Sequence, residues 1–382
     1  MIYFIILFLL LFFAFIYDFG NANVGKNFVS FSILIGLICL SGFRYRVGGD
    51  TLNYMYKFPS MPMLSELRDY EFGTDHLQPL WLLLVATAKS ISDEFYMLQL
   101  IHAIIVNTLI FSFLRSNTKY FFTTILLYYI GYYPYFNFEI LRESIAISIF
   151  LFSIKFIISK NWYLYFSLSF IAFLFHFSAI ILFFIPTILK LNLKPWSFIL
   201  IFFSGILFSD LFSGFINSIN SASSLISSMK EYVEYKATIW GVASLFILNV
   251  LYPSLLYRLS ASVLKIKSNL YRLFNTYILV GASTTYLYIF FRFTNYLTPI
   301  LFIFLTEIIH AFFRARLFRS IRMIPVIIIF ILFIVIHTNR YFSDTSKIVP
   351  SSRWYSRWYP YYSIFDKQED TTRERLILNS GG

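Results

Sequence analysis

Long runs of apolar residues, separated by short polar stretches, dominate the chain. A helix needs about 20 apolar residues to cross the hydrocarbon core of a membrane, within a range of about 17–25. On that scale the pattern predicts about thirteen spans, some of them short, tilted or re-entrant. They lie near residues 2–17, 28–43, 77–91, 95–113, 120–134, 143–158, 162–175, 177–189, 196–212, 239–257, 273–290, 295–310 and 324–337. We therefore expect an all-α polytopic membrane protein with about 12–14 transmembrane helices.

Composition excludes other classes of protein. The 382 residues are 58% hydrophobic and only 13% charged, whereas soluble domains carry about a quarter charged residues. With 48 Phe and 29 Tyr, the chain is too aromatic to be disordered. The single cysteine, Cys39, allows neither an intramolecular disulfide nor a cysteine metal framework. The first apolar segment has no basic residues before it and no small-residue cleavage site, so we do not expect a cleavable signal peptide.

The net charge of +12 predicts orientation in the membrane rather than nucleic-acid binding, because cytoplasmic loops collect Lys and Arg. Five basic clusters predict cytoplasmic loops: Arg115/Lys119, Lys155/Lys160, Lys190/Lys194, Arg258/Lys265/Lys267/Arg272 and Arg314/Arg316/Arg319/Arg322. The opposite side then receives the turn 132–143, the turn at His176, the stretch 213–239 and an aromatic tail, 341–382. Residues 1–340 are predicted to form one membrane domain.

The side on which the long loop 44–76 lies depends on whether the next apolar segment, 77–91, crosses the membrane. A full crossing would put the loop on the cytoplasmic side, and a re-entrant segment would put it outside. The segment is short and opens with Pro79, which favours the re-entrant alternative. Non-helical backbone at membrane depth is tolerated where protein or a wet cavity covers it.

Ionisable residues at membrane depth cost about 2.5–3.5 kcal/mol on insertion scales, so each is a candidate for function. Arg44 and Arg46 precede Gly48-Gly49-Asp50, which combines an anion clamp, close backbone approach and a carboxylate. The alternative is a pair of arginines that reach the membrane surface beside a solvated turn.

Arg142 lies between Glu139 and Glu143 at the start of an apolar helix. Helix capping would explain either carboxylate, but an arginine at this end opposes the helix dipole. Arg142 is therefore a candidate for phosphate binding.

Two more polar residues interrupt apolar segments. His176 falls where the chain should turn at the outer surface and could act as a base, although a lone His is more often structural. Arg292 lies outside against the positive-inside bias.

An acidic run of Asp69, Glu71, Asp75 and His76 could hold a metal or form a solvated face. No Walker A loop or G-x-S-x-G motif occurs.

Five motifs, in order, resemble the EpsG family of membrane polysaccharide proteins: FRYRVGGDTLNYMYKF (43–58), LQPLWLLLVATAKSI (77–91), ILRESIAISIFLFSIKFI (140–157), FHFSAIILFFIP (175–186) and RFTNYLTP (292–299). The family has Glu before Pro79 and Gln after Arg142, where this chain has Gln78 and Glu143. Gln78 therefore cannot act as a general acid or base here.

The resemblance implies a Wzy-type polymerase that joins undecaprenyl-pyrophosphate-linked oligosaccharides on the outer face of the cytoplasmic (inner) membrane. For this chemistry we expect Arg142 and Arg292 to bind pyrophosphate, with Arg44 or Arg46 assisting, and Tyr54, Gln78 and Tyr296 to contact substrate. The base is Asp50, Glu143 or His176, and the residues do not decide among them. No metal or other cofactor is required if arginines neutralise the leaving group.

Two other functions stay open. A polyprenyl-phosphate-dependent glycosyltransferase or ligase would give the acidic run a role, and a flippase for lipid-linked oligosaccharides would form no new bond. The expected partners are the lipid-linked oligosaccharide, membrane lipid, a chain-length regulator and a flippase, with no nucleic acid.

Overall fold

The structure is a computed structural model that describes residues 1–70, 77–191, 193–218, 239–314 and 324–379. It is 77% helical and the described residues contain no strand. Five described helices are long and apolar enough to cross a membrane, and several shorter apolar helices accompany them. The predicted all-α polytopic architecture is therefore confirmed. The expected number of about thirteen spans stays a prediction.

The chain divides into two compact units. Unit 1 comprises Met1–Phe152, Leu174–His176 and Phe330–Gly382, and unit 2 comprises Ser153–Phe173 and Phe177–Ile329. The tail predicted at 341–382 therefore belongs to the same unit as the N-terminal helices.

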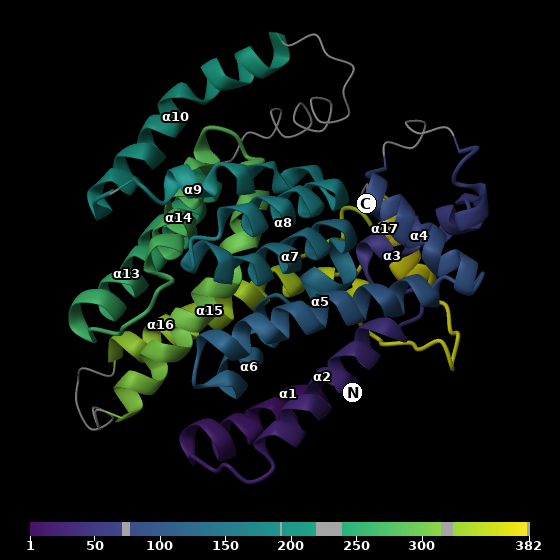
Figure 1. The fold of residues 1–382 in the computed structure, drawn as a ribbon, viewed down its shortest axis with the longest axis horizontal. Helices are drawn as coiled ribbons and strands as arrows, with labels where there is room; N and C mark the ends of the chain where they lie inside the picture. The colour runs from purple at the N-terminus through teal and green to yellow at the C-terminus, as the bar shows by residue number, and fades with distance from the viewer. Residues whose placement is uncertain (71–76, 192, 219–238, 315–323, 380–382) are drawn as a thin grey trace. The chain divides into compact units, whose positions relative to one another are not determined.

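Unit 1 consists of helices that run between two ends, with shorter elements at one of them (Figure 1). Its long elements are α1 (Ile2–Phe13, continued by η1, Ala14–Phe19), α2 (Lys26–Gly42), α5 (Tyr96–Asn117), α6 (Phe121–Gly131), the first part of α7 (Leu141–Ile158) and the last part of α16 (Ile324–Phe342). Its shorter elements are α3 (Gly49–Lys57), η2 (Phe58–Ser60), η3 (Leu64–Glu66), α4 (Pro79–Ile91), η4 (Tyr135–Glu139), η11 (Trp354–Arg357) and α17 (Thr371–Asn379).

Contacts between helices identify the two ends of unit 1. At one end Arg115, near the end of α5, donates to Asn27 Oδ1 at the start of α2 (2.7 Å). At the other end the backbone N–H groups of Tyr45 and Gly48 donate to carbonyls of the tail, at Tyr362 (2.8 Å) and Arg357 (3.0 Å). We call this second end, formed by residues 43–66, 92–95, 132–142 and 343–379, the polar end.

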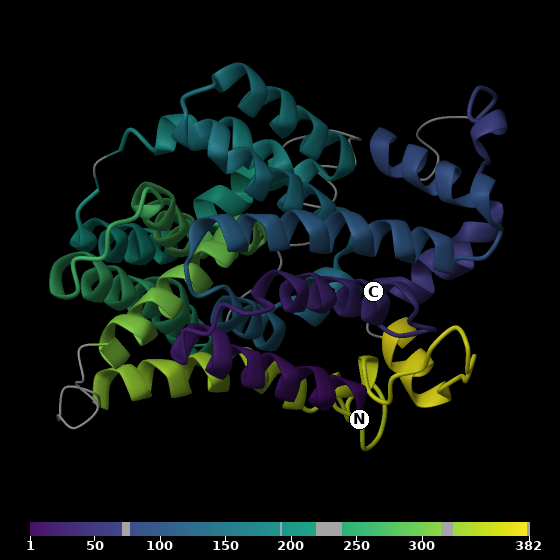
Figure 2. The ribbon, with the colours of Figure 1, turned by 60° about the horizontal axis from the view of Figure 1, so that its bottom comes forward.

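The loop that follows α2 lies at the polar end, and α4 begins and ends there too (Figure 2). At its start, Gln78 contacts Arg142 at the beginning of α7. Near its end, the Lys89 ammonium donates to the carbonyl of Pro59 (2.7 Å) and the Ser90 hydroxyl accepts from the backbone N–H of Leu64 (2.9 Å). Because both ends of α4 contact segments of the polar end, we assign α4 to this end rather than to a full crossing. The loop 44–66 therefore lies on the same side as the tail.

Unit 2 consists of the remaining helices. They are α8 (Trp162–Phe175), η5 (Phe177–Phe183), α9 (Ile185–Ile188), α10 (Pro195–Ser218), α12 (Ile239–Phe246), η6 (Ile247–Leu251), α13 (Tyr252–Arg258), η7 (Leu259–Val263), α14 (Tyr271–Ala282), η8 (Ser283–Thr285) and α15 (Phe290–Arg314). The predicted span 177–189 is broken into a 3-10 helix and the short α9. Pro186 has no N–H group and cannot continue the hydrogen bonding of η5, so this segment falls short of a regular spanning helix.

Candidate functional site

The paired glycines after α2 allow the loop to lie directly against η4. Gly48 has φ +107°, which is in the region that favours glycine. A Cβ atom on Gly48 would lie 2.5 Å from the carbonyl oxygen of Phe138, and one on Gly49 would lie 2.2 Å from Oε2 of Glu139. Only glycine therefore allows the backbone to approach this closely at both positions.

Two carboxylates from these segments cap each other's helices. Glu139, just before α7, accepts from the Gly49 N–H at the start of α3 (Oε1, 2.8 Å). Asp50, in the first turn of α3, accepts from the Leu141 N–H at the start of α7 (Oδ2, 3.3 Å). Both carboxylates lie at positive helix ends, where negative charge is favoured. This reciprocal cap fixes the start of α7, and with it Arg142.

Glu139 also anchors the tail. Its Oε2 forms an ion pair with Arg357 Nη1 (2.8 Å) and its Oε1 accepts from Trp358 Nε1 (2.7 Å). With Gly49 it thus has three donors from two segments far apart in sequence. The sequence offered capping as one explanation for Glu139 or Glu143, but it gave no sign of the partners of Glu139 in the tail.

Arg142 lies half-buried beside this cap, in the first turn of α7. Its Nη1 donates to Gln78 Oε1 at the start of α4 (2.9 Å), and its guanidinium lies 5.7 Å from the ring centroid of Tyr54 in α3. A guanidinium has five N–H donors. Among the residues that the structure describes, the bond from Nη1 to Gln78 is the hydrogen bond that Arg142 donates. The structure thus brings together three residues of the first three matching motifs: Tyr54, Gln78 and Arg142.

His102 supports the first turn of α7 and was missed by the sequence analysis. It is fully buried in α5, and its Nε2 lies 3.0 Å from the carbonyl oxygen of Leu141 and 2.9 Å from Ser144 Oγ. The available signal was an ionisable histidine inside the predicted span 95–113. Its contacts position the helix that carries Arg142.

Arg44 has a structural role. Its side chain is fully buried and donates to the carbonyls of Ser41 and Val47 and to the hydroxyl of Thr51. Burial lowers the pKa of Arg44 to about 10, so the guanidinium stays charged at neutral pH. Because its donors are used to hold the turn after α2, we leave Arg44 out of the candidate site.

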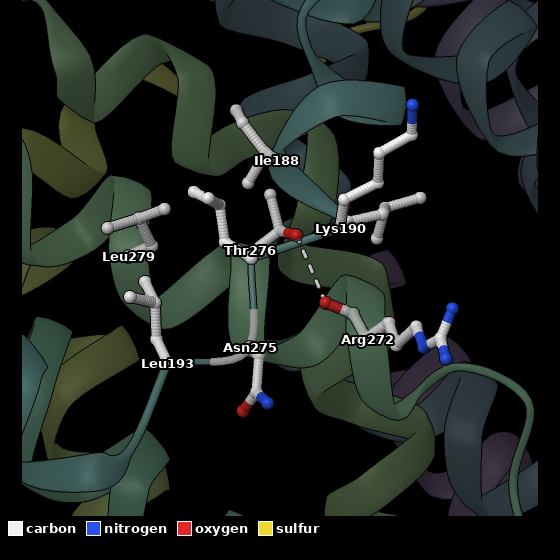
Figure 3. A pocket seen from close by; sticks show the side chains of 9 residues that line it. Ile188, Lys190, Leu193, Arg272, Asn275, Thr276 and Leu279 are labelled. Carbon is white, nitrogen blue, oxygen red and sulfur yellow. Dashed lines mark hydrogen bonds between the residues drawn. The ribbon is translucent and has the colours of Figure 1, made fainter.

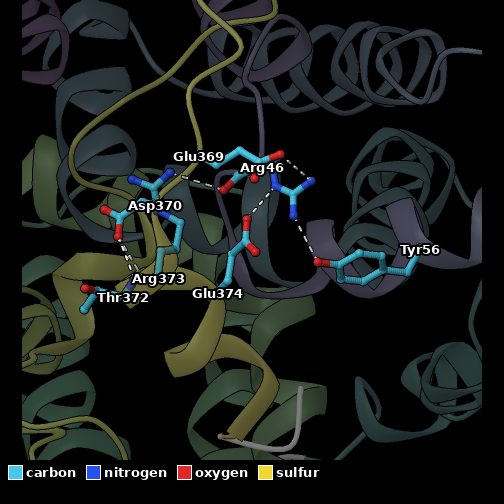
Figure 4. Close-up of polar contacts among 7 residues, drawn as sticks. All are labelled: Arg46, Tyr56, Glu369, Asp370, Thr372, Arg373 and Glu374. Carbon is cyan, nitrogen blue, oxygen red and sulfur yellow. Dashed lines mark hydrogen bonds and ion pairs between the residues drawn. The ribbon is translucent and has the colours of Figure 1, made fainter.

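Arg46 binds the tail (Figure 4). Its Nε donates to Glu374 (2.6 Å), its Nη1 lies 3.3 Å from Glu369, and its Nη2 donates to the hydroxyl of Tyr56 (3.0 Å). Burial acts to lower the pKa of Arg46, but the hydrogen bond and charge of Glu374 outweigh it and raise the pKa above its ordinary value. Arg46 therefore holds α17 and its preceding loop, and it is not available to substrate in this arrangement.

The five buried or half-buried arginines of the polar end thus differ in their partners. Arg46 and Arg357 are paired with carboxylates, and Arg44 and Arg373 are buried among backbone carbonyls. Arg142 is half-buried and has a neutral partner, Gln78. Among these five it is the one suited to bind an added anion.

Comparison with known proteins is consistent with these motifs. The family model of the EpsG family matches residues 26–363, most of the chain. The chain belongs to the EpsG family. No curated protein and no solved structure matches. EpsG-family membership, together with the apolar helices, makes this chain a multi-pass membrane protein of polysaccharide biosynthesis.

The three candidate bases of this EpsG-family chain lie in unit 1. Asp50 is half-buried and contacts Leu141, the residue before Arg142. Glu143, one residue after Arg142, is 1% exposed, and His176 is 5% exposed. Asp50 is thus the most accessible of the three, and the identity of the base stays a prediction.

The remaining candidates do not belong to unit 1 or lie partly outside the described residues. Arg292 and Tyr296 belong to unit 2, where Tyr296 is fully buried and its hydroxyl hydrogen-bonds to Ser178 Oγ (2.8 Å). That Arg142 and Arg292 bind one pyrophosphate therefore stays a prediction. Within the acidic run, Glu71, Asp75 and His76 lie outside the described residues, as do most of the stretch 213–239 and Arg316, Arg319 and Arg322.

Unit 2 has a cavity of about 350 Å³ between the chain after α9 and the start of α14 (Figure 3). Lys190 and Arg272 line it, but their charged groups point away from Asn275 and Thr276 in the view. Both belong to loops that the positive-inside rule predicts to be cytoplasmic. Membrane topology thus explains these two charges without a ligand.

Proposed function

We propose that the protein polymerises undecaprenyl-pyrophosphate-linked oligosaccharide units on the outer face of the cytoplasmic membrane. The observation that carries this proposal is the environment of Arg142. Its guanidinium is oriented by Gln78 and Tyr54 at the start of a helix, and most of its donors have no partner among the described residues. A guanidinium at the positive end of a helix suits a pyrophosphate.

The chemistry is a glycosyl transfer. The bond between the donor sugar's anomeric carbon and the pyrophosphate oxygen breaks, and the electron pair leaves with the lipid pyrophosphate. A hydroxyl of the acceptor sugar forms the new glycosidic bond and gives its proton to Asp50, Glu143 or His176. Arg142 stabilises the charge that develops on the leaving group through an oxocarbenium-like transition state.

A strain deleted for this gene tests the proposal when it is complemented by wild type, Arg142→Ala or Arg375→Ala at matched protein levels. Arg375 is an exposed arginine of α17 at the same end and serves as the control. We expect single repeat units to accumulate and long chains to be lost in the deletion strain. Wild type and Arg375→Ala should restore long chains, and Arg142→Ala should not.

Other outcomes would overturn the proposal in identifiable ways. Loss of the repeat unit itself would indicate an earlier glycosyltransferase. Intact units confined to the cytoplasmic face would indicate a flippase. Unchanged polymer length and yield with Arg142→Ala would remove Arg142 from the mechanism.

A further inference from the structure

A cavity of about 440 Å³ lies in unit 1, next to the polar end. Its walls come from α1, the end of α6, the end of α16 and the tail around η11. Phe4 and Leu7 contribute from α1, Ile130 from α6, and Tyr355 and Trp358 from the tail. The volume lies in the range of small-ligand pockets, about 300–1,000 Å³.

The polar groups of three aromatic wall residues are already bonded within the protein. The hydroxyl of Tyr3 donates to the carbonyl of Trp358 (3.0 Å), and that of Tyr129 donates to the carbonyl of Tyr3 (3.0 Å). Trp358 Nε1 donates to Glu139 (2.7 Å). These side chains therefore offer ring faces and edges to a ligand. A sugar needs several hydrogen-bonding partners, whereas a hydrocarbon chain needs none, so these three side chains favour hydrocarbon over a sugar.

The cavity adjoins the surface of α1. Phe4 is 58% exposed although it lines the cavity, and Phe8, Leu11 and Phe12 further along α1 are also exposed. In a membrane protein, exposed apolar side chains of a spanning helix face lipid tails. A chain in the bilayer can thus reach the cavity without crossing a polar surface.

One wall of the cavity is connected to the Arg142 site. Trp358 donates to Glu139, and Glu139 accepts from Gly49, which precedes Asp50. Asp50 in turn caps the helix on which Arg142 lies. A lipid chain held against Trp358 and a phosphate held by Arg142 would therefore share one rigid framework.

We propose that this cavity holds part of the polyprenyl chain of the lipid-linked substrate. The identity of the chain rests on the function proposed above, whereas the preference for hydrocarbon rests on the cavity alone. The chain would add binding energy through burial of apolar surface and would present its phosphate end to the polar end of unit 1.

Substitutions that fill the cavity test this. Leu7→Trp adds bulk to its wall, and Leu11→Trp makes the same change one turn along α1 at a position that does not line the cavity and is 54% exposed. Binding of undecaprenyl phosphate to the purified full-length protein is measured by titration, with a dioleoyl phosphatidylglycerol competitor. We expect Leu7→Trp to weaken binding at least about tenfold and Leu11→Trp to leave it unchanged. Ile130→Trp, a cavity-lining position on α6, replaces Leu7→Trp if that variant does not fold.

Unchanged binding by both cavity variants would overturn the inference, and so would equal competition by phosphatidylglycerol, which would indicate an ordinary phospholipid site. The proposed function fails separately. Suppose that Leu7→Trp abolishes binding of undecaprenyl phosphate, but that the deletion strain still makes long polymer. The cavity would then stand as a polyprenyl site, and the proposed polymerase function would be refuted.

Discussion

Glu139 connects three parts of the polar end through one carboxylate. Its side chain is 8% exposed and that of Arg357 is 14% exposed, at a distance of 2.8 Å. Removing one member of a buried ion pair leaves the other charge without compensation, and this typically costs about 3–5 kcal/mol. The Gly49 N–H and the Trp358 indole would lose their acceptor in the same change.

We therefore expect Glu139→Ala to destabilise the protein by about 3 kcal/mol or more, measured as a lowered melting temperature of the purified protein. Glu94→Ala is the matched control. Glu94 and Lys367 are 63% and 57% exposed and 3.6 Å apart, and such surface pairs contribute about 0–1 kcal/mol. Equal melting temperatures for the two variants would show that the Glu139 contacts do not hold the tail.

At the scale of the element, α17 depends on Arg373. Although it lies on a short helix near the end of the chain, Arg373 is 1% exposed. It donates to the carbonyls of Ser356, Pro360 and Arg46. These bonds join α17 to η11 and to the loop after α2, and hydrogen bonds from charged donors contribute about 1.5–3 kcal/mol each.

Loss of these bonds should release α17 while the spanning helices stay folded. We expect Arg373→Ala to increase the rate of protease cleavage between residues 364 and 371 by about tenfold or more, since 1.4 kcal/mol corresponds to a factor of ten. Arg375→Ala, on the exposed side of the same helix, should cleave at the wild-type rate. Similar rates for both variants would mean that the other contacts of α17, among them the ion pair of Arg46 with Glu374, hold it in place without Arg373.

The length of the apolar runs predicted the long elements, because each run is visible within its own stretch of sequence. The predicted segments 95–113 and 143–158 correspond to α5 and α7. Breaks within a segment were harder to predict, as in 177–189, where Pro186 lies. A run of apolar residues can form a spanning helix or a shorter 3-10 helix, and the sequence pattern does not distinguish the two.

The candidate site could be predicted only in part, because its contacts join residues far apart in the sequence. The motifs identified Arg142, Gln78 and Tyr54 as candidates, but they did not show that these residues lie together in the fold. Arg46 looked like a ligand for an anion because its partner Glu374 lies 328 residues away in the sequence. Arg44 looked like one because its partners, although close in sequence, meet its guanidinium only when the chain after α2 folds into a buried turn. Partners across the fold decide which arginine is available, and these become visible only in three dimensions.

At the scale of the whole molecule, the placement of α4 fixes the sidedness of unit 1. With α4 at the polar end, α1 leads away from that end, α2 returns to it, and α5, α6 and α7 alternate between the ends. The loop with Arg115 and Lys119 then lies at the end opposite to the tail, where the positive-inside rule predicts the cytoplasm. If α4 crossed the membrane fully, the loop 44–66 and the tail would lie on opposite sides of the membrane.

Single cysteines test this arrangement in a Cys39→Ser background. Ser60 and Asp93 flank α4 and are exposed, and Ser116 is exposed at the opposite end. In intact cells or sealed right-side-out vesicles, we expect a membrane-impermeant maleimide to label Ser60→Cys and Asp93→Cys. Ser116→Cys should be labelled only after permeabilisation. Labelling of Ser60→Cys and Asp93→Cys from opposite sides would mean that α4 crosses the membrane. Gln78 at one end of α4 and Lys89 at the other both contact the polar end. A crossing by α4 would break one of these contacts, and loss of the contact between Gln78 and Arg142 would contradict the candidate site.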